Sequence, residues 1–309
     1  MKVKNISLLA MLLMFYVASR GNPHKIDPTN TYFKEDTNKD AVFNNGYRDM
    51  NELFYPKIQN GQAYLYSRKS GTVTFGPCRY IYYDDLNNKV GARIFRFVDQ
   101  NGLIGYASIK QDETISILLN GQYTEATAMQ NEGACVKDEN FYYFIDKNGI
   151  RFSEHNYVEA SPFENQGFYS RIKKDDGLYA IIDKNENIVL DSFQSIEPLP
   201  LFTTFGAGKR DGKVVLFSLE QFEDDSESRI TSILNYTDIH MLGRDSRYAI
   251  VTNEKGKKGV ILVWNGEVFI PAEYVDIQFG NIDNIDNTFF FRCQKEDATV
   301  DYFYTKGVW

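Results

Sequence analysis

The stretch Phe141-Tyr-Tyr-Phe-Ile-Asp-Lys-Asn-Gly149 returns in altered form as Leu178-Tyr-Ala-Ile-Ile-Asp-Lys-Asn-Glu186, which places Asp146 and Asp183 37 residues apart. Each copy has an apolar run, then a polar turn, and a second apolar run follows. Asp, Asn and Gly tolerate the positive φ of tight turns, so each copy predicts a β-hairpin. Recurrence at such a spacing predicts a chain built from copies of one small unit.

Weaker copies extend this repeat in both directions. They begin at Tyr64-Leu-Tyr-Ser67, Gly105-Tyr-Ala-Ser108, Lys213-Val-Val-Leu-Phe-Ser218, Gly259-Val-Ile-Leu-Val-Trp264 and Asp301-Tyr-Phe-Tyr-Thr305. The spacing drifts from 35 to 46 residues, which surface loops tolerate at little cost. The pattern therefore predicts six repeats and a half copy at its C-terminal end.

A further run of strand-forming residues, such as Phe168-Tyr-Ser-Arg-Ile-Lys-Lys-Asp175, completes each unit. Tyr, Phe, Ile and Val fill the runs, and few stretches show helical spacing. The fold class predicted is all-β, with repeated antiparallel units of three to four strands in a propeller-like closed ring. An open β-hairpin solenoid is the alternative. The half copy at Asp301–Trp309 is expected to pair with strands near Asn60–Ser67, which would cover an aggregation-prone sheet edge.

The copy between Asn140 and Lys184 carries a longer pattern. It contains Ile145-Asp-Lys-Asn-Gly149, Tyr157-Val-Glu-Ala160, Pro162-Phe163 and Gly167-Phe-Tyr-Ser-Arg-Ile-Lys-Lys174, and Val275-Asp-Ile277 echoes part of it. This pattern resembles the bacterial WG-type β-repeat over roughly residues 60–309. The Trp-Gly pair of that family is absent, and Leu178-Tyr179 stands in its place. The resemblance implies no shared enzymatic activity and transfers no site residues.

The N-terminal region predicts an export signal over residues 1–19 and a polar tether over residues 20–40, followed by one β-repeat domain over residues 41–309. Within the domain, Ala41–Pro56 could form a short helix or cap. Lys2 and Lys4 precede a short apolar stretch, as in export signals. The end of this stretch resembles a lipoprotein signal, but Arg20 stands where the lipidated Cys is expected. The predicted location is the periplasm or the cell surface. Alternatively, residues 1–19 form an uncleaved anchor or a buried N-terminal helix. If they stay uncleaved, they are the only segment expected to contact the membrane.

The net charge limits the possible partners, and the cysteine count limits the number of disulfides. Removing residues 1–19 deletes two lysines and no acid, which changes the net charge from −8 to −10. A negative surface repels phosphate backbones, so we expect no nucleic-acid partner. Three cysteines, Cys78, Cys135 and Cys293, allow one disulfide at most, and the fold should not depend on it.

No recognised motif for catalysis, a cofactor or a metal is complete, so the sequence predicts no catalytic, cofactor-binding or metal-binding residue. The histidines are scattered, Cys135 and His155 would meet only through an accident of folding, and Phe205-Gly-Ala-Gly-Lys209 lacks the rest of a phosphate loop. Asp36-Thr-Asn38-Lys-Asp40 and Asp146-Lys-Asn148-Gly149 begin like calcium loops but lack the later ligands. Both are predicted to be turns. The pairs Asp84-Asp85, Asp175-Asp176 and Asp224-Asp225 are predicted to face water.

Aromatic residues make up 15% of the chain, with 21 Tyr and 23 Phe. Most are expected to fill the spaces between sheets, and an exposed subset could contact a ligand. The leading hypothesis is a non-enzymatic binding or scaffolding module of the bacterial cell envelope that recognises a protein or glycan through loops and aromatics. The alternative is a glycan-active hydrolase with paired carboxylates about 5–10 Å apart in a central pocket. A purely architectural component is a third possibility.

Overall fold

The computed structural model describes residues 53–86, 93–130, 133–164, 167–200, 204–220, 229–243, 247–283 and 288–305. These residues form seven antiparallel sheets and one helical turn, α2 (Tyr83–Leu86), so the predicted all-β fold of three- to four-stranded units is confirmed. The predicted signal, the tether and most of the predicted cap lie outside the described residues. Within the described part, no helix is long and apolar enough to cross a membrane.

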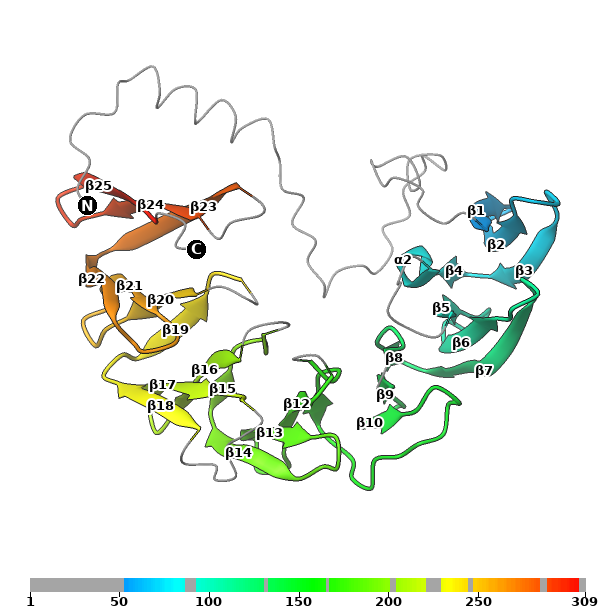
Figure 1. The fold of residues 1–309 in the computed structure, drawn as a ribbon, viewed down its shortest axis with the longest axis horizontal. Helices are drawn as coiled ribbons and strands as arrows, with labels where there is room; N and C mark the ends of the chain where they lie inside the picture. Colours follow the sequence, from blue (N-terminus) through cyan, green and yellow to red (C-terminus); the bar gives the residue numbers. More distant parts are fainter. Residues whose placement is uncertain are drawn as a thin grey trace, which may run out of the picture. The chain divides into compact units, whose positions relative to one another are not determined.

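The sheets follow one another along the chain, and within each sheet neighbouring strands are consecutive in sequence (Figure 1). Sheet 1 contains β1 (Phe54–Gln59), β2 (Gln62–Ser67) and β3 (Val73–Cys78); sheet 2 contains β4 (Tyr80–Ile81), β5 (Ile94–Val98), β6 (Ile104–Ile109) and β7 (Ile115–Tyr123); sheet 3 contains β8 (Glu125–Ala126), β9 (Ala134–Lys137) and β10 (Tyr142–Ile145). Sheet 4 contains β11 (Glu159–Ala160), β12 (Tyr169–Lys173), β13 (Tyr179–Asp183) and β14 (Ile188–Phe193); sheet 5 contains β15 (Ser195–Ile196), β16 (Phe205–Arg210), β17 (Lys213–Ser218) and β18 (Ile230–Leu234). Sheet 6 contains β19 (Asp238–Met241), β20 (Tyr248–Thr252), β21 (Lys258–Leu262) and β22 (Val268–Tyr274), and sheet 7 contains β23 (Asp276–Asp283), β24 (Thr288–Gln294) and β25 (Val300–Tyr304).

Sheets 1–6 belong to one compact unit, Asp49–Val275, and sheet 7 belongs to another. The choice between a closed ring and an open stack stays a prediction, as does the single domain over residues 41–309.

The repeated hairpin forms the last two strands of the four-stranded sheets 2, 4, 5 and 6, whereas the copy at Phe141–Gly149 supplies only the last strand, β10, of the three-stranded sheet 3. In sheet 4 it is β13 and β14, and the two preceding strands complete the unit. Asp183 closes the hairpin turn because its Oδ1 accepts hydrogen bonds from the backbone N–H groups of Asn185 (2.8 Å) and Asn187 (2.9 Å). Asp146 makes the same two bonds to Asn148 and Ile150, so this predicted turn is confirmed.

The predicted half copy does not pair as expected. Its strand β25 pairs with β24, the strand before it, whereas the strand over Gln62–Ser67 pairs with β1 and β3. A tight turn joins β24 to β25, closed by the hydrogen bond from Lys295 N to Thr299 O (2.9 Å). Local pairing closes only a short loop, which costs less entropy than a distant partner. The predicted cap is also wrong at its end, because Phe54–Pro56 lies in β1.

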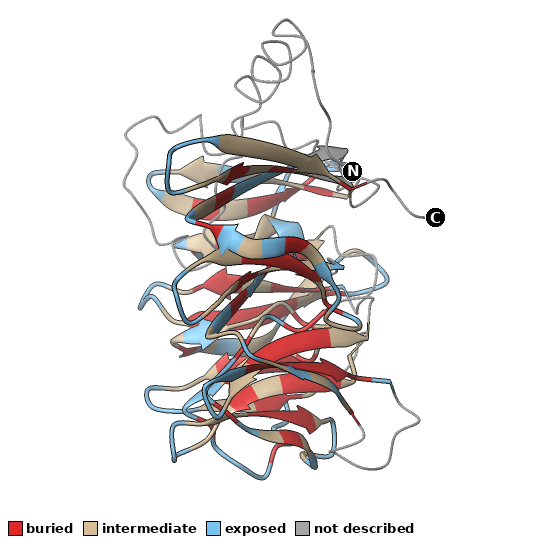
Figure 2. Ribbon diagram, turned by 90° about the vertical axis from the view of Figure 1, so that its left-hand side faces the viewer, coloured by how far each residue is buried: buried red, intermediate tan, exposed pale blue. Residues whose placement is uncertain are grey.

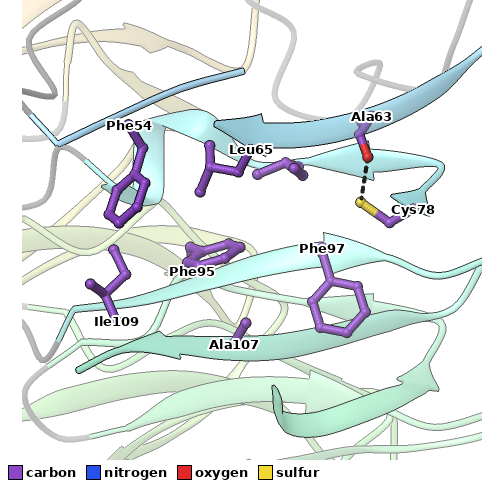
Figure 3. Close-up of a cluster of buried hydrophobic side chains, with 9 residues drawn as sticks. Phe54, Ala63, Leu65, Cys78, Phe95, Phe97, Ala107 and Ile109 are labelled. Atoms are coloured by element: carbon purple, nitrogen blue, oxygen red, sulfur yellow. Dashed lines mark hydrogen bonds between the residues drawn. The ribbon is translucent and has the colours of Figure 1, made fainter. Parts of the chain in front are cut away.

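The hydrophobic core of the larger unit lies between consecutive sheets, with one cluster at each junction. Figure 2 shows the buried residues, in red, along the strands. Figure 3 shows the first junction, where Phe54 and Leu65 of sheet 1 point towards Phe95 of sheet 2. All three are at most 1% exposed. Each such side chain stabilises the fold by about 1.5–3 kcal/mol, and a single sheet could not bury these faces alone.

Two arginines tie consecutive sheets together at equivalent places. Arg96 on β5 donates from Nη1 to the carbonyl of Ala126 (2.7 Å), and Arg171 on β12 donates from Nη1 to the carbonyl of Ile196 (2.6 Å). Both acceptors end the first strand of the next sheet. Arg96 also holds Asp85 through two hydrogen bonds (2.8 and 2.9 Å). The prediction that Asp85 faces water is therefore wrong: its side chain is 4% exposed, since the arginine compensates the cost of burying the carboxylate.

Candidate functional site

A surface hollow of about 450 Å³ lies at the outer edges of sheets 1 and 2, where β3 faces β7. Its walls come from these two strands and from the end of β5 with the turn that follows. The lining residues are Thr74, Phe75, Gly76, Pro77, Cys78, Phe97, Asp99, Gln100, Ile115, Ile117, Asn120 and Gly121. About 300–1,000 Å³ is usual for ligand pockets, so the hollow falls in the lower part of that range.

Irregularities in the two edge strands shape the walls. Pairing of β2 with β3 shifts register between Leu65 and Ala63, and Gly76 in this region has φ 108°. Pairing of β6 with β7 shifts between Ile104 and Tyr106, next to Gly121. A Cβ at Gly121 would lie 2.5 Å from the Asp99 carboxylate, so glycine lets that carboxylate approach β7. Each bulge redirects its strand and opens space beside it.

The floor of the hollow is aromatic and aliphatic. The ring of Phe75, which is partly exposed, meets the rings of Phe95 and Phe97 edge-on, with centroids 5.2 and 5.1 Å away. Ile117 on β7 is 55% exposed. Hydrophobic and aromatic side chains are the usual lining of a ligand pocket.

Besides Thr74, whose hydroxyl donates to the Leu65 carbonyl (2.9 Å), three polar side chains line the hollow and form its rim. Asp99 Oδ1 accepts from the backbone N–H groups of Asn101 (2.8 Å) and Leu103 (2.9 Å), which fixes the carboxylate in place. Gln100 Oε1 accepts a long hydrogen bond from Gln62 Nε2 (3.5 Å). The exposed amide of Asn120 makes no hydrogen bond to another described residue. The rim therefore offers one oriented acceptor group and two amides with bonding capacity to spare.

The hollow has little capacity for acid–base chemistry. Among its lining residues, Asp99 is the one carboxylate, and none is Lys, Arg or His. Burial raises the pKa of the Cys78 thiol to about 12, against a weaker opposing effect of a backbone hydrogen bond with Tyr80. A thiol with that pKa is not a nucleophile at neutral pH.

Two further polar clusters repeat on adjacent sheets. In sheet 3, Glu125 Oε1 lies 2.9 Å from Lys137 Nζ, and Tyr142 OH donates to Glu125 Oε2 (2.7 Å). Sheet 4 repeats the arrangement with Glu159, Lys173 and Tyr179, at 2.8 and 2.9 Å. Burial favours a higher pKa for Glu125, but the hydrogen bonds from Tyr142 and Lys137 lower it overall. Both carboxylates are engaged within their own sheets and stay ionised at neutral pH.

A third carboxylate joins sheet 4 to the segment after sheet 3. Glu186 Oε2 accepts from Glu154 N (2.6 Å) and lies 3.3 Å from His155 Nδ1, while Tyr157 OH donates to Oε1. The Glu186 side chain is 7% exposed. Burial favours a higher pKa, but these hydrogen bonds prevail and lower the pKa of Glu186.

The motifs considered in the sequence do not form a site in the described structure. His155 contacts Glu186, whereas the Cys135 thiol is buried and points to the Ala160 carbonyl (3.6 Å). All three cysteines are free. The Gly-x-Gly segment lies inside β16. Among the described residues, no three His, Cys, Asp or Glu side chains gather as a metal site. Asp224-Asp225 lies outside the described residues.

The hollow was not predicted, although Gly76-Pro77 and Asn120-Gly121 within strand patterns signal bulges.

Comparison with known proteins gives structural likeness alone. No family model matches the chain, so the resemblance to WG-type repeats stays a prediction. No curated protein matches it either. Among solved structures, Hsv2 of Kluyveromyces lactis is 9% identical, over 83% of this chain and 95% of that chain, with a TM-score of 0.40. BamB from Moraxella catarrhalis is 12% identical, over 82% and 79%, with a TM-score of 0.37. The C-terminal WD40 domain of Sif2 is 11% identical, over 67% of each chain, with a TM-score of 0.35.

Proposed function

We propose that this chain is a non-enzymatic binding module that recognises a protein or glycan through exposed side chains. The observation that supports this best is the composition of the hollow: an apolar floor, a polar rim and a single carboxylate among its lining residues. Hydrolysis of a glycoside by the usual mechanism needs two carboxylates flanking the bond. The hollow can hold a ligand but lacks the second group.

The carboxylate clusters outside the hollow favour the same conclusion. Glu125 and Glu159 each bind a lysine and a tyrosine of their own sheet. Glu186 accepts from a backbone N–H group and a tyrosine hydroxyl. A general base needs a free lone pair directed at substrate and a pKa near the working pH. These groups are engaged and their pKa values are lowered.

The proposed location is the cell envelope. Its support is the basic start and short apolar stretch of residues 1–19, together with the net charge of −8 for the whole chain. An acidic exported chain would meet proteins and glycans of the envelope rather than nucleic acid.

The test is capture of envelope components with the full-length chain, run beside a matched panel of glycoside-cleavage assays. We expect a retained component whose binding weakens in Ile117→Asp and persists in Ile233→Asp, a control at an equally exposed isoleucine (56%) of sheet 5. Turnover of a glycoside that disappears in Asp99→Asn would refute the proposal. So would a failure to retain any component, whereas equal retention in both isoleucine variants would show that the hollow plays no part in binding.

A further inference from the structure

We infer that the hollow between β3 and β7 is a subsite for one neutral sugar residue of a glycan, an inference that rests on the proposed function. The lining combines an exposed aromatic and aliphatic floor with a rim of one carboxylate and two amides. A sugar ring has the matching make-up, since it presents C–H groups on its faces and hydroxyl groups around its edge.

The floor suits the faces of such a ring. Phe75 is held in place by edge-on contacts to two buried rings, so it is a rigid surface that loses little entropy on binding. Ile117 extends this apolar surface from β7. The volume of about 450 Å³ admits a sugar ring and leaves an open side through which a longer glycan could continue.

The rim suits hydroxyl groups. A hydroxyl both donates and accepts, and it needs a partner of each kind. Asp99 is an acceptor whose orientation is already set by two backbone N–H groups. Asn120 supplies both a donor and an acceptor, and its amide is uncommitted among the described residues. Such fixed polar groups give orientation and specificity within an apolar pocket.

Other classes of ligand fit less well. An anionic ligand would meet Asp99 without any lysine, arginine or histidine among the lining residues. A cationic ligand would meet a carboxylate whose lone pairs are partly used by Asn101 and Leu103. An added peptide strand would need a regular edge, yet β3 has Pro77, which lacks an N–H group, and both strands are bulged.

The experiment is a titration followed by NMR of isoleucine δ-methyl groups in the full chain. The probes are the methyl glycosides of glucose, galactose, mannose and N-acetylglucosamine. Glucuronic acid and lysine amide are the charged comparators. At least one neutral glycoside should shift the methyl signals of Ile115 and Ile117, which line the hollow, and leave Ile233 on β18 unchanged.

Variants then separate the subsite from general surface binding. Asn120→Ala should weaken glycoside binding about 2- to 10-fold, the effect of one neutral hydrogen bond. Gln111→Ala, at an exposed turn outside the hollow, should leave it unchanged. Phe75→Leu should also weaken binding, and unchanged methyl signals in sheets 4–6 show that the variant is folded.

Three results would overturn the inference: no neutral glycoside shifts the two methyl signals, lysine amide or glucuronic acid shifts them more strongly, or Asn120→Ala and Gln111→Ala bind equally. None of these three results tests the broader proposal of a binding module, which the capture experiment tests separately.

Discussion

The same turn position recurs in three copies of the repeat. Replacing its residue by glycine should raise the free energy of unfolding in one copy and lower it in another. Gly149, Glu186 and Glu113 occupy the same place in the turns after β10, β13 and β6, each donating its backbone N–H three residues back. All three have positive φ, at 79°, 62° and 65°. The glutamates therefore adopt a conformation that favours glycine, and they differ in what their side chains contact.

For Glu113→Gly we expect a gain in stability. The left-handed conformation costs a residue with a Cβ about 1–2 kcal/mol, which glycine avoids. Glycine loses more conformational entropy on folding, which offsets about 0.5–1 kcal/mol of this gain. The Glu113 side chain makes no hydrogen bond to a described residue, so nothing else is lost. The free energy of unfolding should rise by about 0.5–1 kcal/mol.

For Glu186→Gly we expect a loss. The same relief of about 0.5–1 kcal/mol applies, but the carboxylate that holds Tyr157 OH and Glu154 N is removed. Each hydrogen bond to a charged group contributes about 1.5–3 kcal/mol. Water can replace the acceptor at the exposed Glu154 N–H but less readily at the buried Tyr157. We therefore expect the free energy of unfolding to fall by about 1–3 kcal/mol.

The measurement is urea unfolding followed by circular dichroism, with equal slopes required before midpoints are compared. Because the pKa of Glu186 is lowered from its usual 4.5 in the folded protein, its contribution is fully present above pH 4.5 and is lost as the pH falls through the folded value. The stability difference between wild type and Glu186→Gln should therefore shrink below pH 4.5. Equal shifts for Glu113→Gly and Glu186→Gly, or a difference that does not change with pH, would refute the reasoning.

Three other predictions concern a hairpin turn, a contact between sheets and the buried thiols. Gly149→Ala should lower the free energy of unfolding by about 1–2 kcal/mol, because alanine is strained at φ 79° and its Cβ would lie 2.7 Å from the Leu119 side chain, which together exceed the smaller entropy loss of alanine on folding; a variant as stable as wild type in urea would contradict this. Arg171→Met keeps an apolar stem but removes the donor of the hydrogen bond to the Ile196 carbonyl (2.6 Å). It should lower the free energy of unfolding by about 1–2 kcal/mol in the same assay, and Arg171→Lys should lower it less. The reverse order would be incompatible with this hydrogen bond. Burial raises the pKa of all three cysteine thiols, those of Cys78, Cys135 and Cys293. Ellman's reagent at pH 8 should therefore modify none of them before urea unfolds the chain. Rapid labelling of the native protein would contradict the described burial.

Much of the local structure could be predicted because it depends on residues close together in the chain. The hydrogen bonds of Asp146 and Asp183 close turns within four residues, so the motif Asp-Lys-Asn already contains the donors and the acceptor. The alternation of apolar residues likewise marks the flanking strands. The candidate site was not predicted for the opposite reason, since Phe75 and Asn120 line one hollow from different sheets.

The sequence by itself determined the all-β class, the hairpin turns and a repeat of about forty residues, because backbone hydrogen bonds and side-chain alternation act over short distances. Only the tertiary structure decided that the hairpins of sheets 2, 4, 5 and 6 each join two preceding strands in one sheet, that Val300–Tyr304 pairs with Thr288–Gln294, and that Asp85 is buried against Arg96. Those outcomes depend on which apolar faces meet between units, and on where a buried charge finds its partner. The alternation within one strand does not specify which strands pair across a turn, or which arginine a buried carboxylate meets.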